Sequence, residues 1–123
     1  MTILISSILM ILLDFIFLWN MSPTFTRTVQ QIQGSPFQLY FRGVLPCYLL
    51  LLFALNYFIL FPHKPVFDAF LLGVCIYGVY ETTNYSTLKD WPLRMVVIDT
   101  LWGGTLFALV TWMTYQLNYL GKV

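Results

Sequence analysis

The chain has 123 residues, of which 59% are hydrophobic and only 9% are charged, and its formal net charge at pH 7 is +1. Soluble domains carry charge on about a quarter of their residues, so this chain has too few charged side chains to cover a surface in water. The near-neutral balance provides neither a basic patch for nucleic acid nor an acidic tail. We therefore expect a membrane protein without a nucleic-acid partner, with residues 1–123 forming a single domain.

The first apolar run covers about residues 2–19, which is enough to cross a hydrocarbon core of ~30 Å at ~1.5 Å per residue. No Lys or Arg precedes it, Asp14 interrupts it, and no small-x-small cleavage site follows Trp19. These features predict a retained membrane helix rather than a signal peptide, ending near Asn20 before Pro23. Asp14 would then lie roughly 8 Å below that interface.

The residues from Met21 to Arg42 form the longest polar stretch, with two arginines, four glutamines and a Gly34-Ser35-Pro36 break. Two hypotheses fit this stretch. It is either an interfacial helix that ends before Gly34 or an ordered surface loop.

The second span, about residues 43–61, is almost continuously apolar and is followed by a tight Pro62-His63-Lys64-Pro65 turn. His63 is the only histidine, and we expect a plain interfacial residue rather than a ligand. Cys47 and Cys75 lie in separate apolar runs, which is typical of inert packing thiols. We therefore expect no zinc or haem site at these residues, and no cofactor.

The third span runs from about residue 66 to 84 and places Gly73, Tyr77, Glu81 and Asn84 at helical spacing on one side. Small residues on such a face let neighbouring membrane helices approach closely.

The fourth span, about residues 91–119, is expected to begin with Asp90 as N-cap and Pro92 in its first turn. Within it, Gly103-Gly104 predicts either a kink or a close helix contact. The overall fold class is thus an all-α integral membrane four-helix bundle, with an interfacial segment between the first and second helices.

Four spans place both chain ends on one side of the membrane. The positive-inside rule predicts the first and third connections in the cytoplasm and the termini on the non-cytoplasmic side, by a margin of two charges. The basic residues concerned are Arg27, Arg42, Lys89 and Arg94 on the first side, and Lys64 and Lys122 on the second.

Three carboxylates share one level in this arrangement, on the side of the two polar connections. Ionisable groups that cannot face lipid must face each other inside a bundle. The predicted binding cluster consists of Asp14, Glu81, Asn84, Arg94 and Asp99, supported by Tyr77, Tyr80, Thr83 and Trp102. Such a cluster indicates a proton-coupled path, a site for a hard metal ion or a pocket for a polar headgroup. The alternative is an interhelical hydrogen-bond network that only fixes helix registry.

The same residues resemble the signature of the membrane proteins grouped as domain of unknown function 2177. The resemblance rests on Tyr77-x-x-Tyr80-Glu81-x-Thr83-Asn84, Thr87-Leu88-x-x-Trp91-Pro92 and Asp99-x-x-Trp102-Gly103. It implies a four-span membrane protein of a kind found in bacteria and large DNA viruses, whose bacterial members are often encoded near lipid-modifying genes. It implies no particular activity. Two departures stand out: Glu81 replaces the usual aspartate, and Asp14 lies five residues before Trp19, where a closer pair is usual.

The chain lacks a nucleophile–base pair and a cofactor motif, so the sequence favours a non-enzymatic function. We expect the cluster to bind or transport a lipid headgroup, a proton or a small solute. The alternative is a structural membrane component of a larger assembly such as a virion. The expected partners are membrane lipid, further copies of this chain or other membrane proteins of an assembly.

Overall fold

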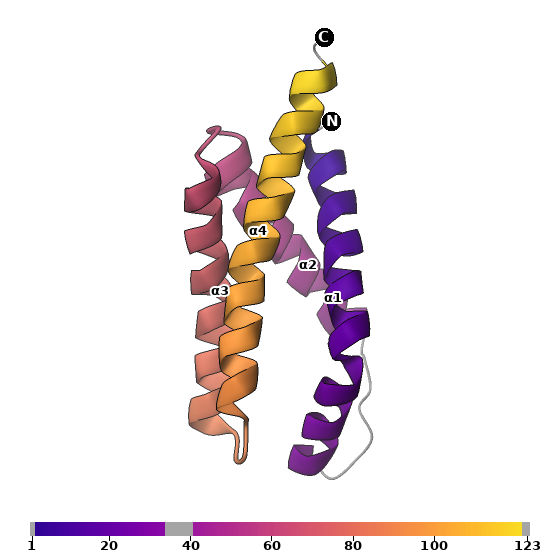
Figure 1. Ribbon diagram of the computed structural model, residues 1–123, viewed down its shortest axis with the longest axis vertical. Helices are drawn as coiled ribbons and strands as arrows, with labels where there is room; N and C mark the ends of the chain where they lie inside the picture. Colours follow the sequence, from indigo (N-terminus) through magenta and orange to yellow (C-terminus); the bar gives the residue numbers. More distant parts are fainter. Residues whose placement is uncertain (1, 34–40, 122–123) are drawn as a thin grey trace.

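The structure is a computed structural model that describes residues 2–33 and 41–121. In this part of the chain the ordered elements are α1 (Thr2–Gln33), α2 (Phe41–Leu55), α3 (Val66–Thr87) and α4 (Leu93–Gly121), with a short π-helix, η1 (Asn56–Leu60), continuing α2. Figure 1 shows α1, α3 and α4 running along the long axis, while α2 crosses obliquely behind them.

Four stretches are long and apolar enough to cross a membrane. They are Thr2–Met21, Arg42–Leu60, Val66–Thr87 and Leu93–Leu120. Membrane-spanning helices satisfy their own backbone hydrogen bonds, which explains why apolar runs of this length fold as helices rather than as open strands. The predicted all-α, four-span architecture is confirmed.

Helix α1 is longer than the sequence predicted. It does not end near Asn20 but continues through Pro23 to Gln33, although its candidate membrane-crossing part still ends at Met21. Proline removes one amide donor from a helix, and the next strong helix breaker is Gly34, so ten further residues continue the hydrogen-bonded ladder. The helical hypothesis for this stretch therefore holds as far as Gln33, as an extension of α1, while residues 34–40 lie outside the described residues.

The connection between α3 and α4 also differs from the prediction. Helix α4 begins at Leu93, and Asp90 is not its N-cap but adopts a left-handed backbone conformation with φ 63°. Aspartate tolerates this conformation better than most residues. The carbonyl of Pro92 instead accepts the first helical hydrogen bonds, from the amides of Met95 and Val96. The left-handed residue turns the chain back so that Trp91 is buried in the bundle.

Glycines bring α3 and α4 into backbone contact. A Cβ atom on Gly73 would overlap the carbonyl oxygen of Gly103, and one on Gly103 would overlap the ring of Tyr77. A Cβ atom on Gly104 would collide with Val74 and Phe70. Of the two hypotheses for the glycine pair, the close helix contact is confirmed, and α4 continues unbroken through it.

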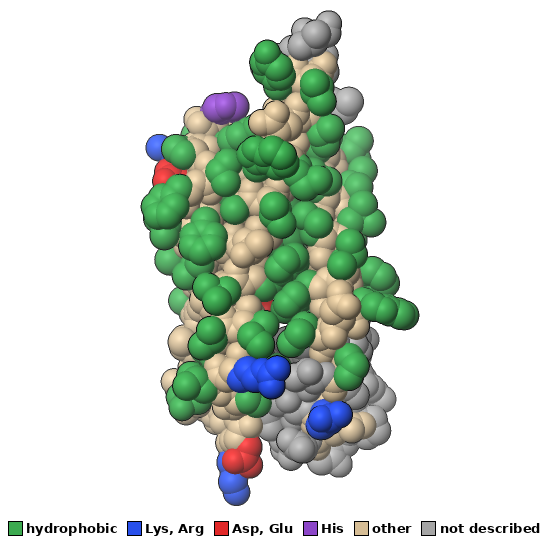
Figure 2. Space-filling model, in the orientation of Figure 1, with side chains coloured by type: hydrophobic (Ala, Val, Ile, Leu, Met, Phe, Trp, Pro, Cys, Tyr) green, Lys and Arg blue, Asp and Glu red, His purple; other side chains and the backbone are tan. Residues whose placement is uncertain are grey.

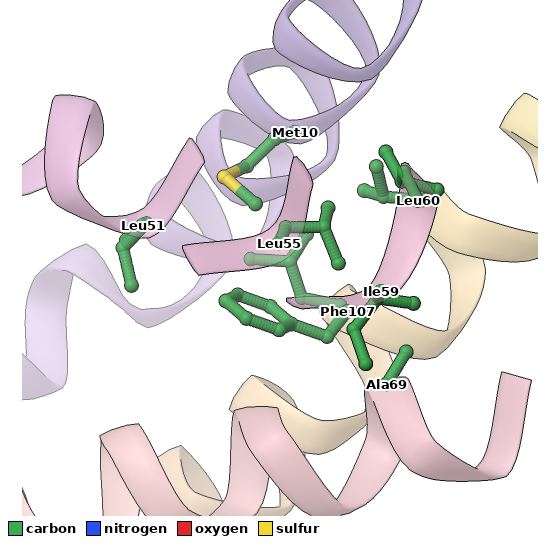
Figure 3. Packing of buried hydrophobic residues seen from close by; sticks show 9 residues of the cluster. Met10, Leu51, Leu55, Ile59, Leu60, Ala69 and Phe107 are labelled. Atoms are coloured by element: carbon green, nitrogen blue, oxygen red, sulfur yellow. The ribbon is translucent and has the colours of Figure 1, made fainter. Parts of the chain in front are cut away.

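An apolar core joins α1, α2, η1 and α4 at mid-height. Figure 3 shows Met10 of α1, Leu55 of α2 and Phe107 of α4 pointing toward one another, with Ile59 and Leu60 of η1 beside them. Three of these side chains, those of Met10, Leu55 and Phe107, are fully buried. Close packing of this kind stabilises membrane helices through dispersion contacts, because lipid removes most of the hydrophobic driving force.

Both ends of the described chain lie at the same end of the bundle (Figure 1). The α3–α4 connection and the last turn of α1 lie at the opposite end. Figure 2 shows an apolar surface over most of the bundle, with Lys and Arg side chains gathered mainly toward the end that carries the α3–α4 connection. This distribution is compatible with either orientation in a membrane, so the predicted non-cytoplasmic location of the termini stays a prediction.

Candidate functional site

Asp14 links three helices through its carboxylate. The Tyr48 hydroxyl of α2 donates a short hydrogen bond to Asp14 Oδ2, and Trp102 Nε1 of α4 donates to Asp14 Oδ1 at 2.9 Å. Phe17, on the next turn of α1, stacks on the Trp102 indole with ring centroids 4.6 Å apart, which holds the indole in place. Both carboxylate oxygens of this buried aspartate are therefore satisfied by aromatic donors from other helices.

Glu81, near the end of α3, is fully buried. The indole of Trp91, in the α3–α4 connection, donates a hydrogen bond from Nε1 to Glu81 Oε2 at 2.8 Å. The other oxygen, Oε1, accepts no hydrogen bond from an amide, hydroxyl or indole group of the described chain. Burial of a carboxylate oxygen without a donor is costly, so Oε1 is an open acceptor inside the bundle.

Asp99 approaches Glu81 from α4. Its carboxyl group lies within hydrogen-bonding reach of Glu81, and the charged groups that act on it are those of Glu81 and, at longer range, Asp14. Each of these groups is acidic. A carboxyl group donates a hydrogen bond only in its protonated form, so a hydrogen bond between Asp99 and Glu81 would need one proton. We call Asp14, Glu81 and Asp99 the acidic cluster.

Tyr77 lies between the two parts of the acidic cluster. Its hydroxyl is close enough to Asp14 and Asp99 to feel both charges, and its ring covers the bare backbone of Gly103. The ring also meets Phe107 edge-on, with centroids 6.4 Å apart. Tyr77 is thus a neighbour of both Asp14 and Asp99 at the contact between α3 and α4.

Four other residues of the predicted cluster lie outside these contacts. Arg94 is exposed on α4, and among the described residues it has no ion pair with a carboxylate. Tyr80 and Thr83 are exposed on α3, and the half-buried Asn84 lies beside the Tyr80 hydroxyl. The structure thus brings together Asp14, Tyr77, Glu81, Asp99 and Trp102. A binding role for any of these residues stays a prediction.

Sequence reasoning missed two donors of the site, Tyr48 and Trp91. Tyr48 offered only a weak signal, since it is one hydroxyl within an apolar run. Trp91 belongs to the motif that carried the family resemblance, but the predicted cluster did not include it, and it is buried against Glu81.

A second set of buried polar groups lies nearer the end with the chain termini, and it carries no charge. Asn56 Nδ2 donates to the Leu52 carbonyl at 2.8 Å and to Ser6 Oγ at 3.2 Å. The hydroxyl groups of Thr111 and Thr114 on α4 are fully buried and bond to no described protein atom. We call Ser6, Asn56, Thr111 and Thr114 the neutral cluster.

The register of α1 against α4 places these groups at one level. Asn118 Nδ2 donates to Thr2 Oγ1 at 3.0 Å, which pins the two antiparallel helices at that end. One turn further along each helix, Thr114 and Ser6 lie at the same height. The neutral cluster therefore begins one turn inside the bundle with Ser6 and Thr114, and Thr111 lies about one turn deeper.

The described part of the chain contains no group of three or more His, Cys, Asp or Glu side chains that could hold a metal ion. Within the acidic cluster, Glu81 and Asp99 form a pair, while Asp14 is bonded to Tyr48 and Trp102. His63 lies in the turn before α3 and stacks on Tyr115, with centroids 4.2 Å apart. Cys47 and Cys75 are exposed free thiols within the spanning segments.

Fold and site together define a multi-pass integral membrane protein with a buried acidic cluster between its helices. A comparison with protein-family models matches residues 1–116 to a family described as predicted membrane protein (DUF2177). The chain belongs to this family, as the sequence signature indicated. Comparisons with curated proteins and with solved structures found no match.

Proposed function

We propose that this membrane protein binds and releases a proton at the Glu81–Asp99 pair. The observation that carries the proposal is the open acceptor Oε1 of buried Glu81 within reach of the Asp99 carboxyl group. Two carboxylates in contact inside a low-dielectric bundle repel each other strongly, and one shared proton removes that repulsion while supplying the missing donor.

The surroundings give the two carboxyl groups different roles. Trp91 donates to Glu81 and so favours its charged form, because an indole N–H can donate but cannot accept. Asp99 then carries the proton and donates a hydrogen bond to Glu81. Release of the proton to water leaves both groups charged, and Asp14 is a further acidic group that acts on Asp99.

The exposure of the cluster favours a proton over a larger ligand. Glu81 is 0% exposed, and Asp14 and Asp99 are only 7% and 8% exposed. A lipid headgroup or a polar solute needs an opening that these values do not offer, whereas a proton needs only a transient water contact. Asp99 is the seventh residue of α4, roughly 9 Å from its start, so the short route to water runs toward the α3–α4 connection.

A structural role in a larger assembly is the second candidate, and one observation favours it. Asp14 is bonded to α2 and α4, and Glu81 is bonded to the α3–α4 connection, so each carboxylate fixes elements relative to one another. Under this alternative the Glu81–Asp99 pair keeps its proton at every pH at which the protein is folded, and the acidic cluster only fixes the helices in register.

Infrared spectroscopy of the purified protein in lipid separates the two candidates. A protonated carboxyl group gives a carbonyl stretch distinct from the amide bands. We expect this band at mildly acidic pH, reversible loss of it at mildly alkaline pH, and its absence from Asp99→Asn. Asp68→Asn is the matched control, because Asp68 lies in the first turn of the same helix as Glu81 but outside the cluster.

Three outcomes decide the matter. A band that titrates in the wild type and in Asp68→Asn but is missing from Asp99→Asn supports the proposal. A band that persists at every pH at which the protein stays folded supports the structural role instead. A spectrum without a protonated carboxyl band at any pH contradicts the shared proton.

A further inference from the structure

An apolar groove runs along the outside of the α3–α4 pair. It has a volume of about 500 Å³, and its lining includes Cys75, Gly78 and Thr82 of α3 and Val97, Thr100 and Leu101 of α4. The absence of a side chain at Gly78 leaves the space open, since a Cβ atom there would only touch Thr100, at 3.5 Å. The groove is thus a hollow between two helices whose backbones meet one turn or more away at Gly73 and Gly103.

The groove lies within segments that are long and apolar enough to span the membrane, Val66–Thr87 and Leu93–Leu120. Its surroundings are therefore acyl chains rather than water. An empty hollow of this size would forfeit dispersion contacts along its whole wall, and a flexible hydrocarbon chain can restore them. The apolar lining of the groove and the surrounding lipid both favour an acyl chain as the occupant.

A basic side chain, that of Arg94, lies toward the end of the groove that is nearer the α3–α4 connection. Arg94 precedes Val97 and Leu101 by three and seven residues, so the three side chains form one stripe along α4. Arg94 is in the first turn of α4, is exposed, and forms no ion pair with another described residue. Basic side chains mark this end of the bundle in Figure 2, below an apolar surface.

We propose that the groove and Arg94 together form a binding site for one acidic phospholipid. The acyl chain lies along Gly78 and Leu101, and the phosphate accepts charge-assisted hydrogen bonds from the Arg94 guanidinium, whose planar fork matches phosphate oxygens. The site is independent of the proton pair, because Glu81 and Asp99 are buried inside the bundle and do not line the groove.

Native mass spectrometry of the purified protein, titrated with dioleoyl phosphatidylglycerol or dioleoyl phosphatidylcholine, tests this proposal. We expect the wild type to retain phosphatidylglycerol about tenfold more tightly, as one charge-assisted contact predicts. Arg94→Gln should bring the two lipids to equal, weak retention. Lys89→Gln is the matched control, since it removes an exposed cation of the neighbouring connection that lies outside the groove stripe, and it should keep the preference.

Gly78→Leu fills the groove and should weaken retention of both lipids. Cys75→Phe obstructs the same hollow from an exposed position and covers the case in which Gly78→Leu fails to fold. The proposal is overturned if the wild type retains both lipids equally, if Lys89→Gln loses as much preference as Arg94→Gln, or if both groove-filling variants bind like the wild type. Displacement of phosphatidylglycerol by inorganic phosphate would also overturn it, because the acyl chain would then contribute nothing.

Discussion

The bundle contains two buried polar clusters at different depths, and the hydrogen-bonding needs of their side chains are met in different ways. In the acidic cluster, the donors to Asp14 and Glu81 are aromatic side chains on other elements. In the neutral cluster, Asn56 bonds to a carbonyl of its own helix and to Ser6, and no charge is involved. Between the two levels, fully buried Phe107 of α4 packs against Met10 of α1.

The difference follows from the chemistry of the groups. Hydroxyl and amide side chains can find a partner within their own helix, so they cost little in a membrane and serve well as helix contacts. A carboxylate only accepts hydrogen bonds and carries charge, so it needs donors from neighbouring helices, a proton, or both. The acidic cluster is accordingly the expensive one, which supports a function there rather than in the neutral cluster.

The largest expected effect is at Asp14. Asp14→Ala leaves the Tyr48 hydroxyl and the Trp102 indole without an acceptor, and at 1–3 kcal/mol for each buried orphan we expect a loss of about 3 kcal/mol in the free energy of unfolding. Asp14→Asn keeps one acceptor oxygen and should lose about 1 kcal/mol. Unfolding of the two variants in mixed micelles, followed by circular dichroism, measures both values. Equal stabilities for the two variants would contradict the double acceptor role.

The depth of the three carboxylates in the membrane was predictable from the sequence, but the side chains that donate hydrogen bonds to them were not. Span lengths alone place Asp14, Glu81 and Asp99 at similar depth, and helical spacing alone places Gly73 and Tyr77 on one side of the third span. Tyr48 reaches Asp14 only because α2 crosses obliquely behind the other helices, and no periodicity in the sequence specifies that crossing.

Trp91 and Arg94 illustrate a second reason why the members of the site were not fully predictable from the sequence. Their positions depend on one backbone conformation, the left-handed residue Asp90, which delays the start of α4 by two residues relative to the prediction. Trp91 is buried against Glu81, although the predicted cluster did not include it, and Arg94 is exposed, although the predicted cluster did include it. The backbone conformation of a single connecting residue is not specified by helical periodicity.

An intermediate effect is expected at Asp99. Asp99→Ala removes the donor to Glu81 and leaves a gap, which should cost about 1–3 kcal/mol. Asp99→Asn should cost clearly less, because an amide can donate to Glu81 Oε1 and carries no charge. Thermal melts of both variants in detergent give the ranking. If Asp99→Ala is at least as stable as Asp99→Asn, Asp99 does not donate to Glu81, and the contrast between the two clusters loses its basis.

The smallest effect is expected in the neutral cluster. Thr111→Val and Thr114→Val replace hydroxyl groups that bond to no described protein atom by methyl groups of nearly the same shape. Removing a buried polar group without a partner can be neutral or stabilising, so we expect changes within about 0.5 kcal/mol, or a small gain. Micelle unfolding of the single and double variants, alongside Asp14→Ala, provides the measurement.

The opposite result would change the comparison. A loss of 1 kcal/mol or more in Thr111→Val or Thr114→Val is about what one satisfied hydrogen bond contributes. The hydroxyl groups would then have a partner, and a buried water molecule shared with Ser6 and Asn56 is the one that the neighbouring donors and acceptors could hold. In that case both clusters would depend on satisfied hydrogen bonds, and the neutral cluster would no longer be the less costly of the two.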